Sequence, residues 1–513
     1  MQCKLLIVHI FGSGNLRRSR HRKKRKSKWR RSLRWSVWLL LLISLILSLQ
    51  GSSSQIQSNN NLQHTFKFSD NFGNEPWANL IGLRMVKLRS RLPTVDRVVL
   101  VPDRATFLKA LQTWNLQGRF PILMDDSQYA PMFIRRFQPA EVIRLPSVNA
   151  LPAAEKRITS EGDLLDTVAK TWGVPEYKLL ANHWQKLGWI PAGVVITSLN
   201  DPAAPAAVAL AAAWGQPLTF LDTDFGQPND SLEFSRWQIL RSAVEDKIAQ
   251  TGYGYKKLGD AIDTITIARQ MAVKYRPAVK AKEDFAVTDG LARNPDRSRW
   301  AIAGWIFGSL ERSIYQAMCS IFLDYQTALM FDTYTNESPW YFYALKPAAA
   351  KLEKVGIKTK LFATPNAELK QWRESDRLAS DLLFVNSSGS PSAFTVNGSE
   401  AQVPDIPKWQ TPTAIHFIHS WSAVTPDDAQ TIAGRWLANG AYAYVGSVNE
   451  PYLQAFVPPS TIVSRLLDAV PFLVAARQYQ SSPWKVTAIG DPLMLITPPR
   501  QRISPKDLPY PTP

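Results

Sequence analysis

The chain has 513 residues, of which 45% are hydrophobic, so it can bury the cores of two or three domains and is not disordered as a whole. Its formal net charge is +18, but residues 1–34 hold 13 basic and no acidic residues, which leaves only +5 for the remainder. So small an excess on the folded body does not favour a nucleic-acid-binding protein, and we expect no nucleic-acid partner.

The basic tail, residues 1–34, runs directly into an uncharged apolar segment, WSVWLLLLISLILSLQG, at residues 35–51. This segment is slightly shorter than the ~20 residues that cross a bilayer comfortably, and it also fits a signal peptide that is cleaved near Ser53. In both interpretations the basic tail is cytoplasmic and the following residues lie outside the cytoplasm. The sequence therefore predicts a single-pass membrane anchor or, if cleaved, a secreted or periplasmic protein, with a polar linker over residues 52–75.

Only two cysteines are present, Cys3 and Cys319. Because Cys3 precedes the apolar segment, the exported part has one thiol and no internal disulfide. Cys319 lies in the apolar helical pattern SIYQAMCSIFLDY, which favours a buried core position over a nucleophile. We expect no cofactor.

Residues 76–290 contain an internal repeat. Residues 97–126 and 192–224 each predict an apolar strand, a helix and a second apolar strand that ends in acidic residues. Strands that alternate with helices are typical of a parallel sheet, so we expect a repeated, Rossmann-like βαβ domain. The first copy, with AEVIRLP after it, loosely resembles the repeats of bacterial cell-wall-binding modules, which implies a cell-wall partner.

Two aspartates end each copy: Asp125 and Asp126 in the first, Asp222 and Asp224 in the second. Ligands bind at the carboxyl ends of strands in open α/β sheets, and four carboxylates suit a hard cation. Aspartates at such positions more often cap a helix or start a turn. They are therefore only weak candidates for a metal site, and we expect no metal.

Strands and helices alternate again over residues 300–497, before a Pro-rich tail at residues 498–513. Residues 425–428 predict a helix start, since a proline stands at the first helical position and acids follow in the first turn. Pro471 predicts a break in the later helix STIVSRLLDAVPFLVAARQY.

Three segments of this half carry a resemblance: AIAGWIFGSLERSIYQ at residues 301–316, WLANGAYAYVGSVNEPY at 436–452 and AIGDPLMLI at 488–496. They resemble the strand and helix before the catalytic half, the strand after the nucleophile loop, and the closing Gly-Asp-Pro segment of the gingipain family of cysteine peptidases. The resemblance implies a caspase/gingipain-like parallel-sheet α/β domain over residues 300–497.

The resemblance also implies a catalytic pair, a His after one strand as base and a Cys after the next strand as nucleophile. By the order of the elements, the His position falls on NSSGS, where Ser388 precedes Gly389. The Cys position falls on HSWSA, where Ser420 or Trp421 stands. Neither member of the pair is present, so the sequence predicts a peptidase-like fold without thiol chemistry.

Other chemistry at these two loops remains open. His416 and His419 are three residues apart on a strand, so they point to opposite faces and do not form a metal pair. His419 beside a serine hydroxyl is the arrangement of a serine nucleophile with its base. The candidate catalytic residues are His419, Ser420, Ser422 and Ser388, and the candidate ligand-binding residues are Ser388, Gly389, His419 and Trp421.

Three functions follow from these observations. The leading hypothesis is an uncharacterised bacterial envelope protein, anchored in the membrane, that acts as a gingipain-like pseudoenzyme and binds or scaffolds another envelope protein. The second is a hydrolase, a peptidase with a rewired Ser/His site. The third is a cell-wall or polysaccharide binder. It would need several of the 18 tryptophans on one exposed face, whereas we expect most of them in the core.

Overall fold

The computed structural model describes residues 76–148, 159–335, 337–377, 380–497 and 499–507. The predicted basic tail, apolar segment and polar linker (residues 1–75) lie outside these residues. Among the described residues, no helix is both long enough and apolar enough to cross a membrane.

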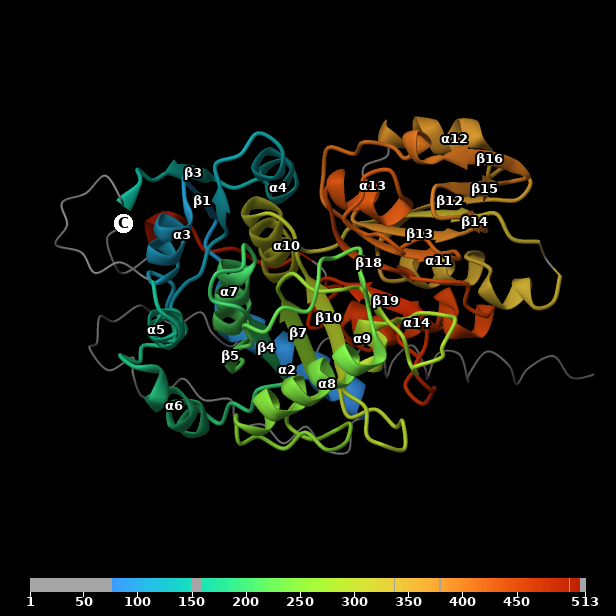
Figure 1. Cartoon of the computed structure of the whole chain (residues 1–513). Coiled ribbons are helices and arrows are strands. Elements are labelled where there is room, and N and C mark those ends of the chain that lie inside the picture. The colour runs from blue at the N-terminus through green and yellow to red at the C-terminus, as the bar shows by residue number, and fades with distance from the viewer. Residues whose placement is uncertain (1–75, 149–158, 336, 378–379, 498, 508–513) are drawn as a thin grey trace, which may run out of the picture. The chain divides into compact units, whose positions relative to one another are not determined.

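The strands are short and follow one another along the whole described chain (Figure 1). In chain order they are β1 (Arg97–Val101), β2 (Ile122–Met124), β3 (Glu141–Arg144), β4 (Gly193–Thr197), β5 (Leu218–Phe220), β6 (Ser231–Leu232), β7 (Thr264–Ala268), β8 (Lys274–Tyr275), β9 (Phe285–Ala286), β10 (Ile302–Ile306), β11 (Thr327–Asp332), β12 (Lys358–Ala363), β13 (Leu382–Asn386), β14 (Gly389–Ser390), β15 (Ala393–Val396), β16 (Ser399–Gln402), β17 (Thr413–Ile418), β18 (Ala441–Ser447) and β19 (Val486–Ile489).

The helices alternate with these strands. They are α2 (Trp77–Arg91), α3 (Arg104–Leu111), α4 (Tyr129–Phe137), α5 (Glu161–Thr171), α6 (Leu180–Leu187), α7 (Ala204–Trp214), α8 (Phe234–Ala249), α9 (Val287–Gly290), α10 (Leu310–Phe322), α11 (Lys346–Glu353), α12 (Leu369–Arg373), α13 (Ile432–Ala438), α14 (Pro459–Leu467) and α15 (Phe472–Ala475). Short 3₁₀ helices are η3 (Tyr177–Leu179), η4 (Trp340–Tyr343), η5 (Glu374–Arg377), η6 (Val403–Asp405), η7 (Leu453–Ala455) and η8 (Pro505–Asp507).

A ten-stranded sheet organises the described part, in the order β12-β11-β13-β17-β18-β19-β10-β7-β4-β5. Neighbouring strands are parallel except β18 and β19, which are antiparallel. The sheet therefore has two parallel halves that run in opposite directions. The strands from β12 to β18 end at one edge of the sheet, and those from β19 to β5 end at the other.

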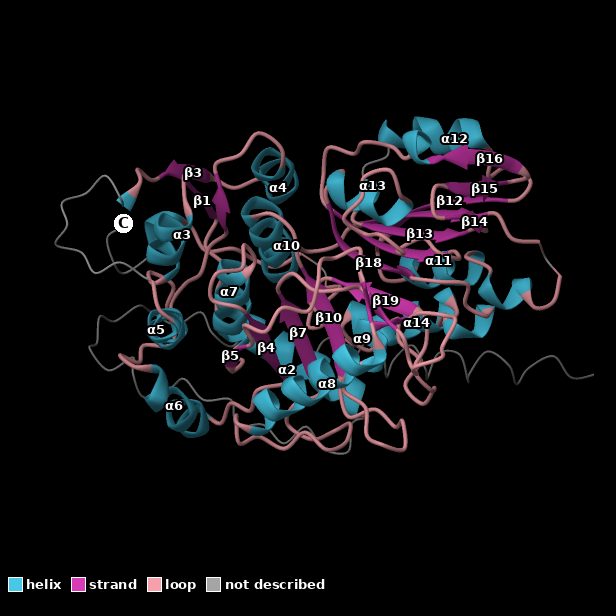
Figure 2. Cartoon of the chain, viewed as in Figure 1, coloured by secondary structure: helices cyan, strands magenta, loops and turns pink. Residues whose placement is uncertain are grey.

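The central strands are buried on both faces, as expected for a largely parallel sheet between helices (Figure 2). In β4, Val195 belongs to one hydrophobic core, whereas Val194 and Ile196 belong to a second core on the opposite face. Helices α2, α7, α10, α11, α14 and α15 contribute to the first core, and α8, α9, α12 and α13 to the second. The fold is thus a mixed α/β fold with a large, mostly parallel sheet.

The predicted repeat forms two βαβ units but not a domain of its own. In each copy the two strands pair in parallel, β1 with β2 and β4 with β5. The first copy forms a separate three-stranded sheet, β2-β1-β3, whereas the second copy lies at one end of the ten-stranded sheet. Strand β7 pairs with β10 across the boundary that we placed between residues 290 and 300. The expected repeated domain is therefore not supported, because the second copy belongs to a sheet that continues into strands beyond residue 300.

Two local predictions in the second half have different outcomes. Pro471 does interrupt its helix, since α14 ends at Leu467 and α15 starts at Phe472. The helix start predicted over residues 425–428 is wrong, because α13 begins only at Ile432. The preceding segment turns back instead, and the Thr431 hydroxyl donates hydrogen bonds to the carbonyls of Thr425 and Asp428, each at 2.8 Å.

Candidate functional site

The two loops with the candidate residues follow β13 and β17, where the parallel strands β13, β17 and β18 end at one edge of the sheet. Asn386 of β13 pairs with Ile418 of β17, so the loops that follow these residues are neighbours. A Cβ atom built on Gly389 would lie 2.9 Å from Nε2 of His419. The structure therefore places the loop after β13 directly against the first residue of the loop after β17.

His419 is buried beneath the hairpin of β14 and β15. Its Nε2 is 3.2 Å from the carbonyl oxygen of Ala393, which fits a protonated nitrogen that donates to this carbonyl. Its Nδ1 is buried and has no hydrogen-bond partner among the described residues. Burial lowers the pKa of His419 to about 4, so the ring is neutral at pH 7.

Gly389 allows the hairpin to close over His419. Its φ is 152°, in a region that side chains disfavour, and a Cβ atom here would lie 2.2 Å from the Ala393 carbonyl oxygen. Ser388, the neighbouring residue, is exposed. Gly389 thus has a structural role in covering the histidine, and Ser388 lies on the outer surface of the same loop.

The hydroxyl of Ser420 has a partner other than His419. It donates a hydrogen bond to the carboxylate of Glu450 at 2.7 Å. The main-chain carbonyl of Glu450 accepts a further hydrogen bond from the Lys485 ammonium, also at 2.7 Å. Ser420 is therefore part of a polar contact between the loops after β17 and β18.

Trp421 occupies a backbone conformation that is unusual for a large side chain. Its φ is 55°, in the left-handed region, where non-glycine residues cost about 1–3 kcal/mol. Asn449 holds it on two sides: its main-chain carbonyl accepts from the Trp421 N–H at 3.2 Å, and its side-chain oxygen accepts from the indole N–H at 3.1 Å. The loop therefore makes a sharp turn at the position where the gingipain resemblance expects a nucleophile.

Ser422 is fully buried and has a structural contact. Its hydroxyl oxygen accepts a hydrogen bond from the main-chain N–H of Ser447 at 3.3 Å. Within the described part of the chain, no hydrogen bond joins the His419 ring to the hydroxyl of Ser420 or Ser422. The residues proposed for a serine hydrolase are thus close in sequence, but their functional groups have different partners.

His416 lies on the opposite face of β17, as the alternation of a strand requires. Its ring contacts Phe384 and Phe456, and both ring nitrogens lack hydrogen-bond partners among the described residues. Burial lowers the pKa of His416 to about 3. It is a neutral core residue.

Cys319 is buried in α10, far along the chain from both loops. Burial raises the pKa of its thiol well above the usual value. A buried, protonated thiol is a poor nucleophile.

The four aspartates that were weak metal candidates do not converge. Asp125 pairs with Arg144 at 3.1 Å, and Asp126 accepts from main-chain N–H groups at the start of α4. Asp222 accepts from the Ser198 hydroxyl at 2.6 Å, and Asp224 from the Gly226 N–H at 2.8 Å. No group of three potential metal ligands occurs within the residues that the structure describes.

Exposed aromatic residues that no sequence prediction included lie beside these loops. In η4, Trp340, Tyr341 and Phe342 are 38%, 47% and 56% exposed, which is high for such large side chains. They lie next to the loop after β13, since Tyr334 packs against Trp340 and donates a hydrogen bond to the Ser387 carbonyl at 3.1 Å. The adjacent sequence WYFY was the available signal.

Most other tryptophans of the described part are buried. The buried ones are Trp114, Trp172, Trp184, Trp189, Trp214, Trp237, Trp300, Trp305, Trp372, Trp409 and Trp436. They form core contacts such as Trp372 with Trp436. This distribution gives no support to a tryptophan-lined face for polysaccharides in the described residues.

No model of a known protein family matches the chain. No curated protein sequence matches it either. Among solved structures, the Arg-specific cysteine proteinase gingipain R (RgpB) covers 60% of this chain and 78% of its own, with 12% identity and a TM-score of 0.40. A structure described only as a protease covers the same shares, with 11% identity and a TM-score of 0.39.

The complex of the pro- and mature domains of RgpB from Porphyromonas gingivalis covers 59% of this chain and 80% of its own, with 11% identity and a TM-score of 0.37. These three likenesses are distant, with TM-scores of 0.40 or below and identities of 11–12%.

Proposed function

We propose that this protein is a non-catalytic, gingipain-like pseudoenzyme that binds another protein of the cell envelope at the edge of the sheet where β13, β17 and β18 end. The observation that carries the proposal is the pairing of His419 with the Ala393 carbonyl, while Ser420 pairs with Glu450. A general base must lie within hydrogen-bond reach of the nucleophile whose proton it takes.

The chemistry of the individual groups supports the absence of catalysis. His419 has a pKa of about 4, which makes it a weak base at neutral pH. Ser422 is buried, and the thiol of Cys319 is buried and protonated. Trp421 presents an indole where a nucleophile would stand.

The exposed aromatic residues of η4 support a binding role. Trp340, Tyr341 and Phe342 expose large, stiff side chains that lose little entropy on association. Tyr452, which is 69% exposed, follows the loop after β18. Aromatic residues exposed together in this way are typical of protein interfaces rather than of isolated surface positions.

Labelling with a fluorophosphonate, which reacts with base-activated serine hydroxyls, tests the lack of catalysis. We expect no labelled serine in the full chain after mass spectrometry of its peptides. Labelling at Ser420 that disappears in His419→Ala would replace the proposal with the rewired Ser/His hydrolase. Ser399→Ala, at an exposed serine of β16, is the matched control.

A photo-crosslinking amino acid at Phe342 tests the binding role in cells of the source organism. We expect one discrete adduct with a protein, and none from the same amino acid at Val355, which is 54% exposed. Adducts with cell-wall glycan instead would favour the polysaccharide binder.

We also propose that residues 1–51 anchor the chain, with the α/β fold outside the cytoplasm. The support is the basic tail before an apolar segment, which sets topology. Protease added to intact spheroplasts should degrade the folded part. Its protection there, with degradation only after lysis, would contradict this orientation.

A further inference from the structure

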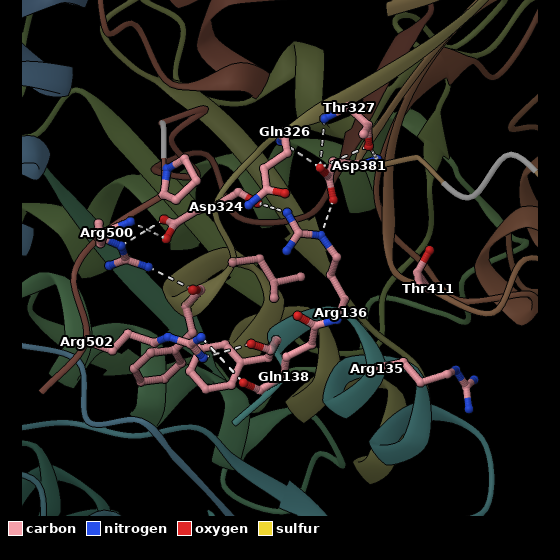
Figure 3. A pocket seen from close by; sticks show the side chains of 14 residues that line it. Arg135, Arg136, Gln138, Asp324, Gln326, Thr327, Asp381, Thr411, Arg500 and Arg502 are labelled. Atoms are coloured by element: carbon pink, nitrogen blue, oxygen red, sulfur yellow. Dashed lines mark hydrogen bonds and ion pairs between the residues drawn. The ribbon is translucent and has the colours of Figure 1, made fainter. Parts of the chain in front are cut away.

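A second polar cavity lies at the opposite end of strand β13 from the His419 loop. It has a volume of about 290 Å³ and opens between α4, the end of α10, the starts of β11 and β13, and the segment 499–502 (Figure 3). Asp381 precedes β13 on this side, whereas Ser388 follows β13 on the other. The cavity is therefore separate from the candidate site described above.

Arginines from three parts of the chain surround this cavity. Arg135 and Arg136 come from the last turn of α4, and Arg500 and Arg502 come from the C-terminal segment. Arg89 of α2 adds a buried guanidinium behind them, 3.2 Å from Asp324. The C-terminal segment is held in place by a strand-like contact, in which the Ile503 N–H donates to the Thr94 carbonyl at 2.9 Å.

The carboxylates at this place do not balance these charges. Asp324 is shared between Arg89 and Arg500, which lies at 2.8 Å, and Asp381 pairs with Arg136. Asp96 pairs with Arg502 at 2.9 Å. The positive residues are Arg89, Arg135, Arg136, Arg500 and Arg502, and the negative residues are Asp96, Asp324 and Asp381.

Burial and neighbouring positive charge both act on the arginines at this cavity. The pKa of Arg89 is lowered to about 9, first by burial and then by the charge of Arg500. Burial also lowers the pKa of Arg500. Both remain cations at pH 7, so further negative charge here would stabilise them.

Several hydrogen-bond donors around the cavity remain available. Arg500 donates through Nε to Asp324 and through Nη2 to the Phe322 carbonyl, and Arg136 likewise uses Nε and Nη2. In both residues Nη1 has no partner among the described residues. The side chains of Gln326 and Thr411 line the cavity and form no hydrogen bonds with described residues. Figure 3 shows Arg135 directed away from the other arginines, so it supplies charge rather than a contact.

We propose that this cavity binds a small organic phosphate monoester, which is a dianion at pH 7, held by Arg136 and Arg500. Two negative charges match the excess, and guanidinium groups bind such tetrahedral oxyanions in a bidentate manner. The cavity is larger than an inorganic phosphate, and Phe137, Phe322 and Leu323 provide apolar lining for an organic part.

Calorimetric titration of the full chain tests the proposal, with inorganic phosphate, inorganic sulfate, phenyl phosphate and phenyl sulfate as probes at fixed ionic strength. We expect phenyl phosphate to bind more tightly than the inorganic ions, because its ring adds apolar contacts. Phenyl sulfate has the same shape but only one negative charge, so it should bind more weakly than phenyl phosphate, and equally tight binding would contradict the match of two charges. Sodium chloride at the same ionic strength should produce no saturable heat.

Gln326→Glu is the decisive variant, because the side chain is exposed and replacing its amide by a carboxylate adds a negative charge without a change of size. We expect it to fold and to bind phenyl phosphate at least about ten-fold more weakly, a loss of about 1.4 kcal/mol. Arg500→Gln should also weaken binding. Arg276→Gln, at an exposed arginine paired only with Glu233, should leave binding unchanged.

Hydrogen exchange gives an independent readout. Because the ligand would contact Arg500, phenyl phosphate should slow exchange in residues 499–503 of the wild type and not in Gln326→Glu. The proposal is overturned if none of the four probes binds at millimolar concentration, or if folded Gln326→Glu binds as tightly as the wild type.

Discussion

The side chain of Asp289 carries an unusual share of the polar contacts in the core. It is only 4% exposed and contacts Arg293 and Arg477 at 3.1 Å each, as well as Arg299. Burial alone would raise its pKa, but the three arginines outweigh burial and lower it to about 2. Other N–H groups of these arginines donate to main-chain carbonyls such as Ser482. The cluster therefore fixes the segment that leads into β19.

We expect Asp289→Asn to lower the free energy of unfolding by roughly 3–5 kcal/mol, because it leaves three buried cations without a carboxylate. Urea unfolding at pH 7 measures this loss. Asp125→Asn breaks an exposed pair with Arg144 and should cost less than about 1 kcal/mol. Equal losses in the two variants would show that the buried cluster stabilises the fold no more than an exposed ion pair does.

His416 should make stability depend on pH. Its pKa is about 3 in the folded chain and about 6.5 when unfolded, so between these values only the unfolded chain takes up the proton. Stability is thus lost as the pH falls from about 6.5 towards 3, by at most about 1.4 kcal/mol per pH unit.

His416→Phe removes this loss, so the difference in unfolding free energy between variant and wild type should grow as the pH falls from 6 to 4. Asp263, whose pKa burial raises to about 7, acts in the opposite direction but is common to both proteins. Parallel stability curves for the two proteins would contradict the assignment.

At the scale of elements, the hairpin of β14 and β15 is the cover of the candidate site. It closes only because Gly389 approaches both the Ala393 carbonyl and His419 without a side chain. The next hairpin turn, Asn397 and Gly398, also has positive φ values, 45° and 78°, but open space surrounds Gly398. Alanine substitutions at Gly389 and Gly398 therefore distinguish the cost of a strained backbone from the cost of a steric clash.

We expect Gly398→Ala to cost about 1 kcal/mol, from the backbone conformation alone. Gly389→Ala should cost clearly more and lift the hairpin from His419. The imidazole would then gain water, and its pKa, followed by NMR, should rise from about 4 towards about 6.5. An unchanged pKa in a destabilised Gly389→Ala would show that the hairpin does not control the site.

Most individual helices and strands could be predicted from the sequence, but the direction of each strand and its neighbours in the sheet could not. Apolar runs marked β13, β17 and β18, and Pro471 marked the break between α14 and α15. The start of α13 was misplaced because hydrogen bonds from Thr431 turn the preceding segment back. The dipeptide Asn397-Gly398, which is typical of a hairpin turn, marks the turn between β15 and β16.

The position of the candidate site could be predicted from the sequence, but the hydrogen-bond partners of its side chains could not. Parallel strand ends bring Gly389 and His419 together, which follows from topology. The partners of Ser420 and Ser422 are Glu450 and Ser447, which lie in or after β18, and such side-chain choices depend on local packing. No pattern indicated the arginine cavity, because its residues come from distant parts of the chain.

At the scale of the whole molecule, the ten-stranded sheet joins residues 76–290 and 300–497, which the sequence predicted to be separate domains. Strand β7 pairs with β10 over five residue positions, and α7 is tied to the other half because Trp214 donates to Asp491 at 2.7 Å. Asp491 also accepts a hydrogen bond from Ser320 at 2.5 Å. The Gly-Asp-Pro segment thus connects α7, α10 and the end of β19.

A fragment of residues 76–295 should therefore not fold cooperatively. It would expose the edge of β7 and the face of α7 that packs on α10. We expect no sigmoidal urea transition by circular dichroism, whereas residues 76–513 should show one. A cooperative transition in the fragment would restore the domain boundary that the sequence predicted.

The proposed function depends on the absence of catalysis by the loops that follow β13 and β17. Cleavage of a mixed fluorogenic peptide library by the full chain tests this absence most directly, beside the variants His419→Ala and Ser420→Ala and the control Ser399→Ala. The account predicts no turnover by any of the four proteins while circular dichroism shows all of them folded. Turnover that the wild type and Ser399→Ala share and that His419→Ala and Ser420→Ala lose would contradict it.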